Sequence, residues 1–249
     1  MEVFELVIFD CDGVLVDSEI VVNRIYAEVS TEMGFPITTE EHIKKFVGHG
    51  TGSDFMKHEL RNHPANYLEI AQARCSAAFQ YELHAVPGIK EALQGLKLPR
   101  CVASNSSLKK IENMLAITGL STEFGENIFS SNMVRRGKPA PDLFLFAAQK
   151  MKVHPKNCIV IEDSPIGTRG AIDAGMTVFG FTGGRHVLPG LEDALYAEGV
   201  SKVFSDMRAL PSMVSISASS SSSSALTQKT LKRVLHPDIR LKVDSQISV

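Results

Sequence analysis

The sequence has little net charge, few cysteines and no long hydrophobic run. Its 249 residues carry a formal charge of −2 at pH 7, so no basic surface for nucleic acid is expected. No apolar run approaches the roughly 18 residues of a membrane span, and no basic leader precedes a hydrophobic segment. Neither membrane insertion nor secretion is therefore expected. The four cysteines form no CxxC pair, which favours free thiols and a cytoplasmic location.

What the sequence does contain is a series of short apolar runs, each followed by small or acidic residues. They cover residues 6–9, 101–103, 158–161, 177–181 and 202–204. Runs this short, rich in Val, Ile and Phe, are typical of parallel strands buried on both faces. Helices are predicted between the later runs, at 108–115, 141–151 and 168–174. Strands that alternate with helices predict an α/β fold with a doubly wound parallel sheet.

The first two runs lie roughly ninety residues apart, far more than the dozen or so that a crossover needs. The sequence between them favours helices at 19–33, 39–47, 53–61 and 67–83. We therefore predict a helical cap at residues 18–84, inserted into an α/β core of residues 1–17 and 85–214. The remaining residues, 215–249, begin with a serine-rich stretch and are predicted to form a flexible tail.

Polar side chains follow three of the predicted strands, at the point where each strand ends. These residues are Asp10, Asp12, Ser104, Asn105, Glu162 and Asp163. Adjacent parallel strands would bring them to one crevice, where several carboxylates would repel one another unless a cation neutralised them. Because the ligands are oxygen atoms and no His or Cys cluster competes, the sequence predicts Mg²⁺.

Lys138 adds fixed positive charge from a loop stiffened by two prolines. A carboxylate nucleophile, a second carboxylate that moves a proton, a metal and a lysine are together suited to phosphoryl transfer. The residues alone thus indicate an enzyme that acts on phosphate esters.

Four motifs in order carry a family resemblance. They are residues 10–18 (DCDGVLVDS), 103–106 (ASNS), 138–142 (KPAPD) and 161–167 (IEDSPIG), followed by 174–176 (AGM). Over about residues 3–212 the chain resembles the haloacid dehalogenase-like hydrolase superfamily, in the branch with a helical-bundle cap on a Rossmann-like core. That branch includes phosphoglycolate phosphatases, sugar-phosphate phosphatases and beta-phosphoglucomutases.

The resemblance implies a role for each acid and for the lysine. Asp10 would be the nucleophile and a metal ligand. Asp12 would be the acid/base, with its backbone carbonyl also on Mg²⁺. Lys138 would stabilise the phosphoaspartate, Asp163 would bind the metal, and Glu162 would be a neighbouring ligand or a supporting acid. Since Asp12 is present, dehalogenation itself is not expected.

Substrate contacts are expected from both parts of the chain. Ser104 resembles the residue that hydrogen-bonds the phosphoryl group, with Asn105 beside it. In the cap, His49 and Gly50 belong to a glycine-rich loop that we expect to face the crevice. The resemblance thus implies a Mg²⁺-dependent phosphatase of a small phosphorylated metabolite such as a sugar or sugar-acid phosphate, with a monomer favoured.

Two alternatives remain open at this stage. A phosphoglucomutase-type enzyme is the first, but beta-phosphoglucomutases carry a His where this sequence has Val22 and an Arg where it has Thr51. The second is a non-catalytic binding module of the same fold, which the presence of Asp10, Asp12 and Lys138 disfavours.

Overall fold

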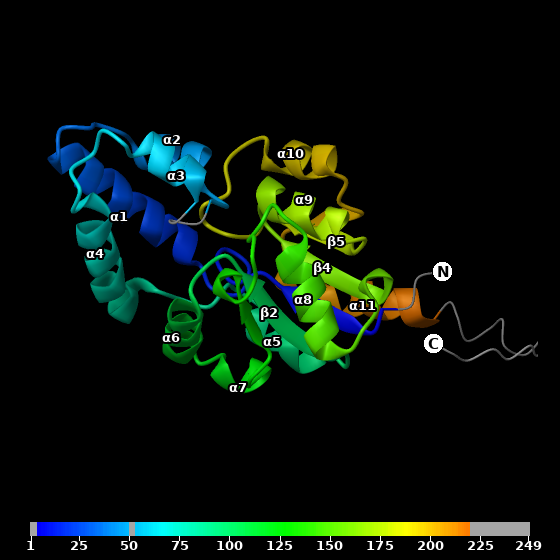
Figure 1. Ribbon diagram of the computed structural model, residues 1–249. Coiled ribbons are helices and arrows are strands. Elements are labelled where there is room, and N and C mark those ends of the chain that lie inside the picture. The colour runs from blue at the N-terminus through cyan, green and yellow to red at the C-terminus, as the bar shows by residue number, and fades with distance from the viewer. Residues whose placement is uncertain (1–3, 50–52, 220–249) are drawn as a thin grey trace, which may run out of the picture.

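One parallel sheet forms the centre of the molecule. The computed structural model describes residues 4–49 and 53–219, and within them the strands are ordered β3-β2-β1-β4-β5-β6 (Figure 1). Every neighbouring pair is parallel. The strands are β1 (Leu6–Phe9), β2 (Arg100–Ser104), β3 (Ile128–Ser130), β4 (Cys158–Glu162), β5 (Thr177–Phe181) and β6 (Lys202–Phe204).

Helices cover both faces of the sheet, because successive side chains of a strand point to opposite sides. Leu6 and Ile8 pack in one apolar layer, and Val7 and Phe9 pack in the other. The first layer contains α8 (Asp142–Met151), α9 (Pro165–Asp173) and α10 (Leu191–Glu198); the second contains α5 (Ile89–Gly95), α6 (Leu108–Thr118), α7 (Ser121–Phe124) and α11 (Leu210–Ser219). This arrangement confirms the predicted doubly wound α/β fold.

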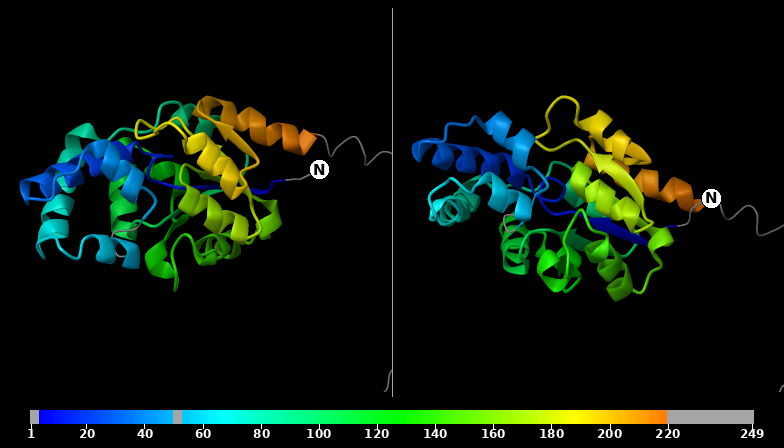
Figure 2. Two further views of the ribbon diagram at one scale, coloured as in Figure 1. Left: turned by 90° about the horizontal axis from the view of Figure 1, so that it is seen from above. Right: turned by 45° about the horizontal axis from the view of Figure 1, so that its top comes forward.

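Among the described residues, four helices lie between β1 and α5, the helix that leads back to the sheet. They are α1 (Ser18–Glu32), α2 (Thr39–Phe46), α3 (Asp54–Glu59) and α4 (Tyr67–Glu82). Figures 1 and 2 show them as a lobe beyond one end of the sheet, where α1 packs against both α2 and α4. We call this lobe the cap helices. The start of α2 is fixed by a capping box in which Thr38 and Glu41 satisfy each other's backbone N–H.

The predicted segments match the observed ones closely, with two kinds of difference. Helix α9 begins at Pro165, earlier than predicted, because Ser164 caps it by accepting a hydrogen bond from Gly167 N. Strand β3 and helices α5, α7, α10 and α11 were not predicted. Strand β3 has three residues and α7 has four, which is too short for a periodic pattern.

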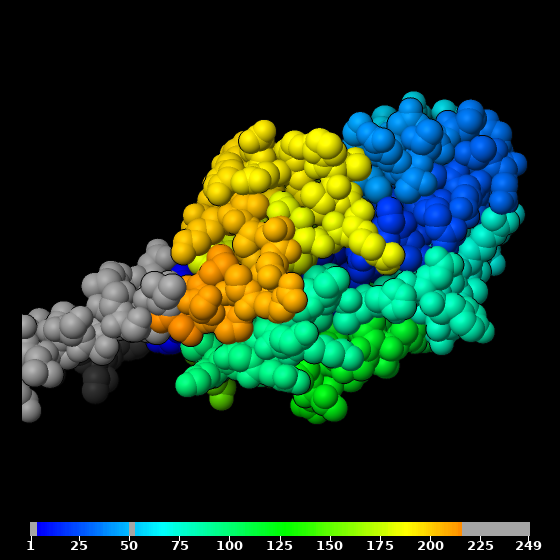
Figure 3. All heavy atoms as spheres, turned by 180° about the vertical axis from the view of Figure 1, so that it is seen from behind, coloured from blue at the N-terminus to red at the C-terminus, as the bar shows by residue number. Residues whose placement is uncertain are grey.

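The last described helix extends past the boundary predicted at residue 215. Helix α11 runs to Ser219, and its buried Leu210 and Val214 pack in the same apolar layer as α5, beside which it lies in Figure 3. The hydroxyl of Ser215 donates to Pro211 O at 2.7 Å, a local bond that lets serine continue a helix. The rest of the predicted tail, residues 220–249, lies outside the described residues.

The cysteine prediction is confirmed: Cys11, Cys75, Cys101 and Cys158 are all free and buried. Among the helices of residues 4–49 and 53–219, none is both long enough and apolar enough to span a membrane.

Candidate active site

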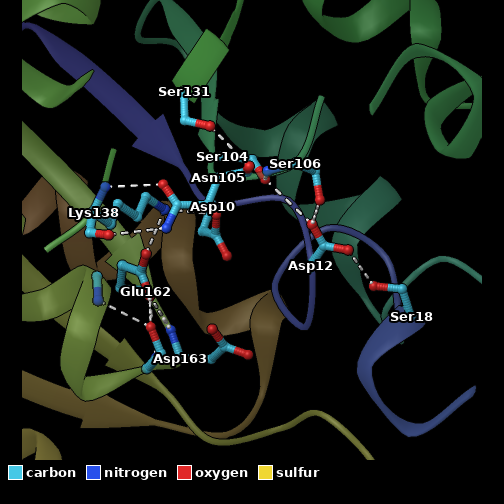
Figure 4. A network of polar contacts seen from close by, with 12 residues as sticks. Asp10, Asp12, Ser18, Ser104, Asn105, Ser106, Ser131, Lys138, Glu162 and Asp163 are labelled. Atoms are coloured by element: carbon cyan, nitrogen blue, oxygen red, sulfur yellow. Dashed lines mark hydrogen bonds and ion pairs between the residues drawn. The ribbon is translucent and has the colours of Figure 1, made fainter. Parts of the chain in front are cut away.

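Three neighbouring strand ends meet at one crevice. Strand β1 lies between β2 and β4, so that Phe9 pairs with Val102 on one side and with Ile161 on the other. The residues that follow these positions therefore come together, as Figure 4 shows. The crevice lies at the carboxyl ends of β1 and β4, the two strands between which the chain order of the sheet reverses. Open α/β sheets bind ligands at such a point. A cavity of about 90 Å³ lies here, between the core and the cap helices.

Lys138 lies between two carboxylates. Its Nζ is 2.7 Å from Asp10 Oδ1 and 2.6 Å from Glu162 Oε1, and the three side chains are 4%, 11% and 0% exposed (Figure 4). Burial raises the pKa of Asp10 well above its ordinary value; Lys138 opposes this shift and the neighbouring acids reinforce it. For Lys138, burial alone would lower the pKa, but Asp10 and Glu162 outweigh it and raise the pKa. The ammonium is therefore charged and held against the proposed nucleophile.

Asn105 positions the loop that carries this lysine. Its Oδ1 accepts a hydrogen bond from Lys138 N at 2.9 Å, and its Nδ2 donates to Lys138 O at 3.1 Å. Ser131 Oγ in turn donates to Asn105 O at 2.9 Å. The predicted substrate-binding residue Asn105 thus uses both ends of its amide to fix the backbone of Lys138.

Asp12 has four side-chain partners on the opposite side of the crevice from Lys138. Ser18 Oγ donates at 2.8 Å, Ser106 Oγ at 2.8 Å, Ser104 Oγ at 3.2 Å, and Lys110 Nζ lies at 3.0 Å. Burial alone would raise the pKa of Asp12, but the positive charge of Lys110 and these hydrogen bonds outweigh it and lower the pKa. Sequence reasoning missed the contacts of Ser18, Ser106 and Lys110.

A detectable signal for Lys110 existed in the sequence. Ser107 caps α6, so Lys110 falls in the first turn of that helix, where the helix dipole disfavours a cation. A carboxylate partner offsets this cost, and for Lys110 that partner is Asp12.

Three acids form the group that could hold a metal ion. Oxygen atoms of Asp10, Glu162 and Asp163 lie within 4.8 Å of one another, and all three residues are buried. Asp163 Oδ2 is buried without a hydrogen-bond partner among the described residues. Three close carboxylates, one of which has an oxygen without a hydrogen bond, suit a hard divalent cation such as Mg²⁺. The side chain of Asp12 points to its own partners and is not in this group.

Two glycines make room for these acids. Gly13 has φ +80°, and a Cβ there would lie 1.9 Å from Asp163 Oδ2. A Cβ on Gly167 would lie 1.8 Å from Glu162 Oε1. The open space at Gly167 lets Glu162 turn toward the start of α9, where Oε2 accepts hydrogen bonds from the N–H groups of Asp163 and Ser164 at 3.1 Å.

His186 is a second residue that the sequence did not reveal. It lies on the loop after β5, is 2% exposed, and places Nε2 2.9 Å from Asp163 Oδ2, an ion-pair distance without hydrogen-bond alignment. Burial alone would lower the pKa of His186, but Asp163 outweighs it and raises the pKa. No motif or spacing in the sequence connects His186 with Asp163.

The cap helices supply the facing wall of the crevice. Asn23 Nδ2 donates to Glu19 Oε2 at 2.8 Å, and His42 Nδ1 lies 2.7 Å from Asn23 Oδ1. Burial, reinforced by the charge of Asp12, raises the pKa of Glu19 to about 7. The predicted contact His49 does line the crevice, with its ring stacked on Phe55 at 3.9 Å. The predicted contact Gly50 lies outside the described residues.

Comparisons with known proteins agree on the family. A model described as haloacid dehalogenase-like hydrolase matches residues 4–175. The chain is 33% identical over 193 residues to the 6-phosphogluconate phosphatase of Escherichia coli K12, covering 76% of this chain and 87% of that protein. It is 29% identical over 178 residues to a phosphorylated carbohydrates phosphatase of Thermotoga maritima, covering 69% of this chain and 82% of that one.

Solved structures are similar as well. A haloacid dehalogenase-like protein from Agrobacterium tumefaciens superposes with a TM-score of 0.78 at 37% identity, over 86% of this chain and 99% of that one. A HAD family hydrolase from Deinococcus radiodurans, solved with bound phosphate and sodium, gives 0.73 at 31% identity, over 86% and 96%. This chain is therefore an enzyme of the haloacid dehalogenase-like hydrolase family, as its four motifs predicted.

Proposed function

We propose that the protein is a Mg²⁺-dependent phosphatase that hydrolyses small phosphorylated metabolites, sugar or sugar-acid phosphates, through a phosphoaspartate on Asp10. The observation that carries this proposal is the division of the two aspartates. Asp10 lies against Lys138 and close to two other acids, Glu162 and Asp163. Asp12 lies instead among serine hydroxyls and Lys110. This division supports attack by one carboxylate and proton transfer by the other.

In the first step, a carboxylate oxygen of Asp10 attacks phosphorus and the bond from phosphorus to the leaving oxygen breaks. The leaving oxygen takes a proton from Asp12, which must be protonated at that moment. Approach of a negative phosphate favours that protonation. Lys138, 2.7 Å from Asp10 Oδ1, offsets the negative charge that gathers on the phosphoryl oxygens.

In the second step, the carboxylate of Asp12 takes a proton from water, and the water oxygen attacks the phosphorus of phospho-Asp10. The bond between phosphorus and Asp10 breaks, inorganic phosphate leaves, and both aspartates return to their starting forms. Ser18, Ser104 and Ser106 hold Asp12 in one orientation through both proton transfers.

Asp10, Asp163 and Glu162 would hold the Mg²⁺, together with the backbone carbonyl of Asp12. Bound there, Mg²⁺ would neutralise the phosphate and the crowded carboxylates and thereby allow an anionic substrate to enter. Glu162 is already engaged by Lys138 and by backbone N–H groups, so we assign it a supporting role beside the other ligands.

The substrate class rests on the cap wall and on the relatives. Glu19 and Asn23 line the crevice together with Asp10 and Asp12, and their polar groups suit the hydroxyl groups of a sugar. Two relatives carry names for phosphatases of phosphorylated carbohydrates. We therefore propose that residues 1–17 and 85–214 perform the chemistry and that the helices of 18–84 select the substrate. We also propose that the enzyme is monomeric and cytoplasmic and has no nucleic-acid or membrane partner.

Substitution Asp10→Asn tests the covalent mechanism. In Asp10→Asn, phosphate release from an aryl phosphate in the presence of MgCl₂ should fall to background. In the unmodified protein, acid quenching during turnover of a phosphate ester with a radiolabelled phosphoryl group should trap label on the protein. Asp193→Asn, an exposed position on α10, should behave as the unmodified protein. Turnover that persists in Asp10→Asn would exclude phospho-Asp10.

A panel of phosphorylated metabolites then identifies the substrate. Beta-glucose 1-phosphate with a bisphosphate primer should yield inorganic phosphate and no 6-phosphate, because Val22 lines the crevice where beta-phosphoglucomutases carry a His. Formation of the 6-phosphate would favour the mutase.

A further inference from the structure

The two walls of the catalytic crevice differ in charge. On the core wall, Lys138 lies against Asp10, and the proposed Mg²⁺ would add a second positive charge there. The opposite wall comes from the cap helices, and its partly exposed members are Glu19, Val22, Val47, Gly48 and His49. Among the described residues, this cap wall therefore offers the negative charge of Glu19 and no lysine or arginine.

The cations of the cap are engaged away from the crevice. Residues 18–84 contain Arg24, Lys44, Lys45, Lys57, Arg61 and Arg74, and none of these described residues lines the crevice. All but Arg61 form ion pairs with acids of the cap, and Arg61 donates to His58 O. Residues 50–52, which lie outside the described residues, are Gly-Thr-Gly and bring no charge. The cap thus has no cation for a second anionic group of a substrate.

The histidines of the cap wall add no positive charge at neutral pH. Burial lowers the pKa of His49, and it lowers the pKa of His42 to about 4. Lys110 also lines the crevice, but it belongs to the core helix α6. Its Nζ already lies 3.0 Å from Asp12 Oδ1 and 3.1 Å from Ser106 Oγ. The charge of Lys110 is therefore committed to the proposed acid/base.

Glu19 lies on the side of the crevice where the alcohol departs in the proposed mechanism. Asp12, which would protonate the leaving oxygen, accepts a hydrogen bond from Ser18 Oγ at 2.8 Å (Figure 4). Ser18 and Glu19 are the first two residues of α1, and Glu19 lines the crevice together with Asp12. Burial and then the charge of Asp12 raise the pKa of Glu19, so the two carboxylates lie within electrostatic range. The alcohol attached to the leaving oxygen is thus expected to meet Glu19.

Glu19 presents an acceptor to that alcohol. Its Oε2 accepts a hydrogen bond from Asn23 Nδ2 at 2.8 Å, whereas no residue within 4–49 and 53–219 donates to Oε1. An ionised carboxylate can only accept hydrogen bonds, so a hydroxyl group of the alcohol would satisfy Oε1. A carboxylate or a second phosphate at the same place would instead bring two negative charges together in a partly buried site.

We infer that the enzyme selects phosphate monoesters of an uncharged polyol or sugar, in which a hydroxyl group of the leaving alcohol donates to Glu19. The charge of Glu19 disfavours substrates that carry a carboxylate or a second phosphate on that alcohol. The inference rests on the proposed phosphatase function and narrows its substrate class from sugar and sugar-acid phosphates to the neutral ones. Glu19 is thus a residue that determines specificity by charge.

Matched pairs of esters test the inference on the full chain with MgCl₂ at pH 8, where Glu19 is ionised because its pKa is about 7. D-Glycerol 3-phosphate and D-3-phosphoglycerate form a short pair, and glucitol 6-phosphate and 6-phosphogluconate form a long one. Within each pair, the first ester has a terminal CH₂OH group where the second has a carboxylate. The kcat/KM of the neutral member should exceed that of the acidic member by about tenfold or more.

Substitution Glu19→Gln removes the charge and keeps an acceptor oxygen, so the preference should fall to about threefold or less. Comparison of the same pairs in the two proteins removes any difference in the intrinsic reactivity of the esters. Glu19→Asp keeps the charge and should retain most of the preference. Glu28→Gln is the matched control, because Glu28 lies on the same helix but is exposed and outside the crevice, and it should leave the preference unchanged.

Mg²⁺-dependent phosphate release from an aryl phosphate tests the proposed function separately. If that release is absent, the function is contradicted, and the preference is read from calorimetric binding of the same pairs, which needs no turnover. If the release is present, equal kcat/KM values within the pairs, or a preference for the acidic member, would overturn the inference and leave the function standing. A preference for neutral esters that persists undiminished in Glu19→Gln would overturn it as well.

Discussion

Replacement of Lys138 by Met should destabilise the folded protein far more than the loss of an exposed ion pair with the same separation would. Lys138 Nζ lies 2.7 Å from Asp10 and 2.6 Å from Glu162, in a site where its side chain is 4% exposed. Methionine preserves much of the length and apolar volume of the side chain. The change therefore removes the charge and leaves two buried carboxylates without their common cation.

The expected loss in the free energy of unfolding follows from the burial of the two ion pairs. At 2.7 Å and an effective dielectric constant of about 20, each pair attracts by about 6 kcal/mol before the cost of desolvating the ions is subtracted. Breaking a buried pair by removal of one partner costs about 3–5 kcal/mol, because the remaining charge stays uncompensated. We expect a loss of that size in the free energy of unfolding, since Glu162 is 0% exposed and cannot turn to solvent.

Urea unfolding at pH 7 with EDTA measures this loss. The chain offers a matched control in Lys44→Met, because Lys44 lies 2.7 Å from Glu40 but both side chains are about 60% exposed. That exposed pair should contribute about 0–1 kcal/mol. MgCl₂ should restore part of the stability of Lys138→Met, because the proposed ion would neutralise the same acids. A loss below about 1 kcal/mol in Lys138→Met, equal to that in Lys44→Met, would refute the argument from burial.

Three further outcomes are expected. Lys110→Met should lower kcat for an alkyl phosphate roughly tenfold more than for an aryl phosphate. Asp12 loses the 3.0 Å contact that positions it, and only the alkyl alcohol, the poorer leaving group, needs its proton. Equal losses of kcat for the two substrates would contradict this. His42 is buried and neutral with a folded pKa of about 4, below the unfolded value, so its contribution is complete above about pH 6.5 and falls by about 3 kcal/mol toward pH 4. Unfolding midpoints across that range should therefore drop less in His42→Asn than in the unmodified chain, and parallel curves would refute this. Gly13→Ala should cost at least about 2 kcal/mol in urea unfolding, because the left-handed backbone is strained and the new Cβ collides with Asp163; a neutral result would be inconsistent with that packing.

Much of the fold could be read from the sequence because the relevant patterns are local. The runs at 6–9 and 177–181 coincide with β1 and β5, since a strand buried on both faces is largely apolar. The run at 202–204 coincides with β6, a partly exposed edge strand. The cap helices could be predicted from the length of the insertion and from Gly34 and Gly48, which follow two of the helical segments. Strand β3, an edge strand, could not be predicted, because its three residues carry no periodic signal.

The candidate site divides in a similar way. Asp10, Asp12, Lys138 and Asp163 were found because each follows a strand or belongs to a motif with recognisable spacing. Lys110 and His186 escaped because they reach the site from a helix and a loop, and their partners lie far away in sequence. Asn105 was predicted as a substrate contact, but its bonds to the Lys138 backbone could not be predicted, since they depend on how two loops meet.

By itself, the sequence determined the doubly wound sheet, the inserted helices, the family and the principal acids of the site. These follow from hydrophobic periodicity and from chemical groups whose positions are fixed relative to a strand end. Only the tertiary structure decided which acids share Lys138, which serines hold Asp12, and which residue of the cap lies against which residue of the core. Those features depend on the directions of side chains from segments distant in sequence, and no local pattern encodes such directions.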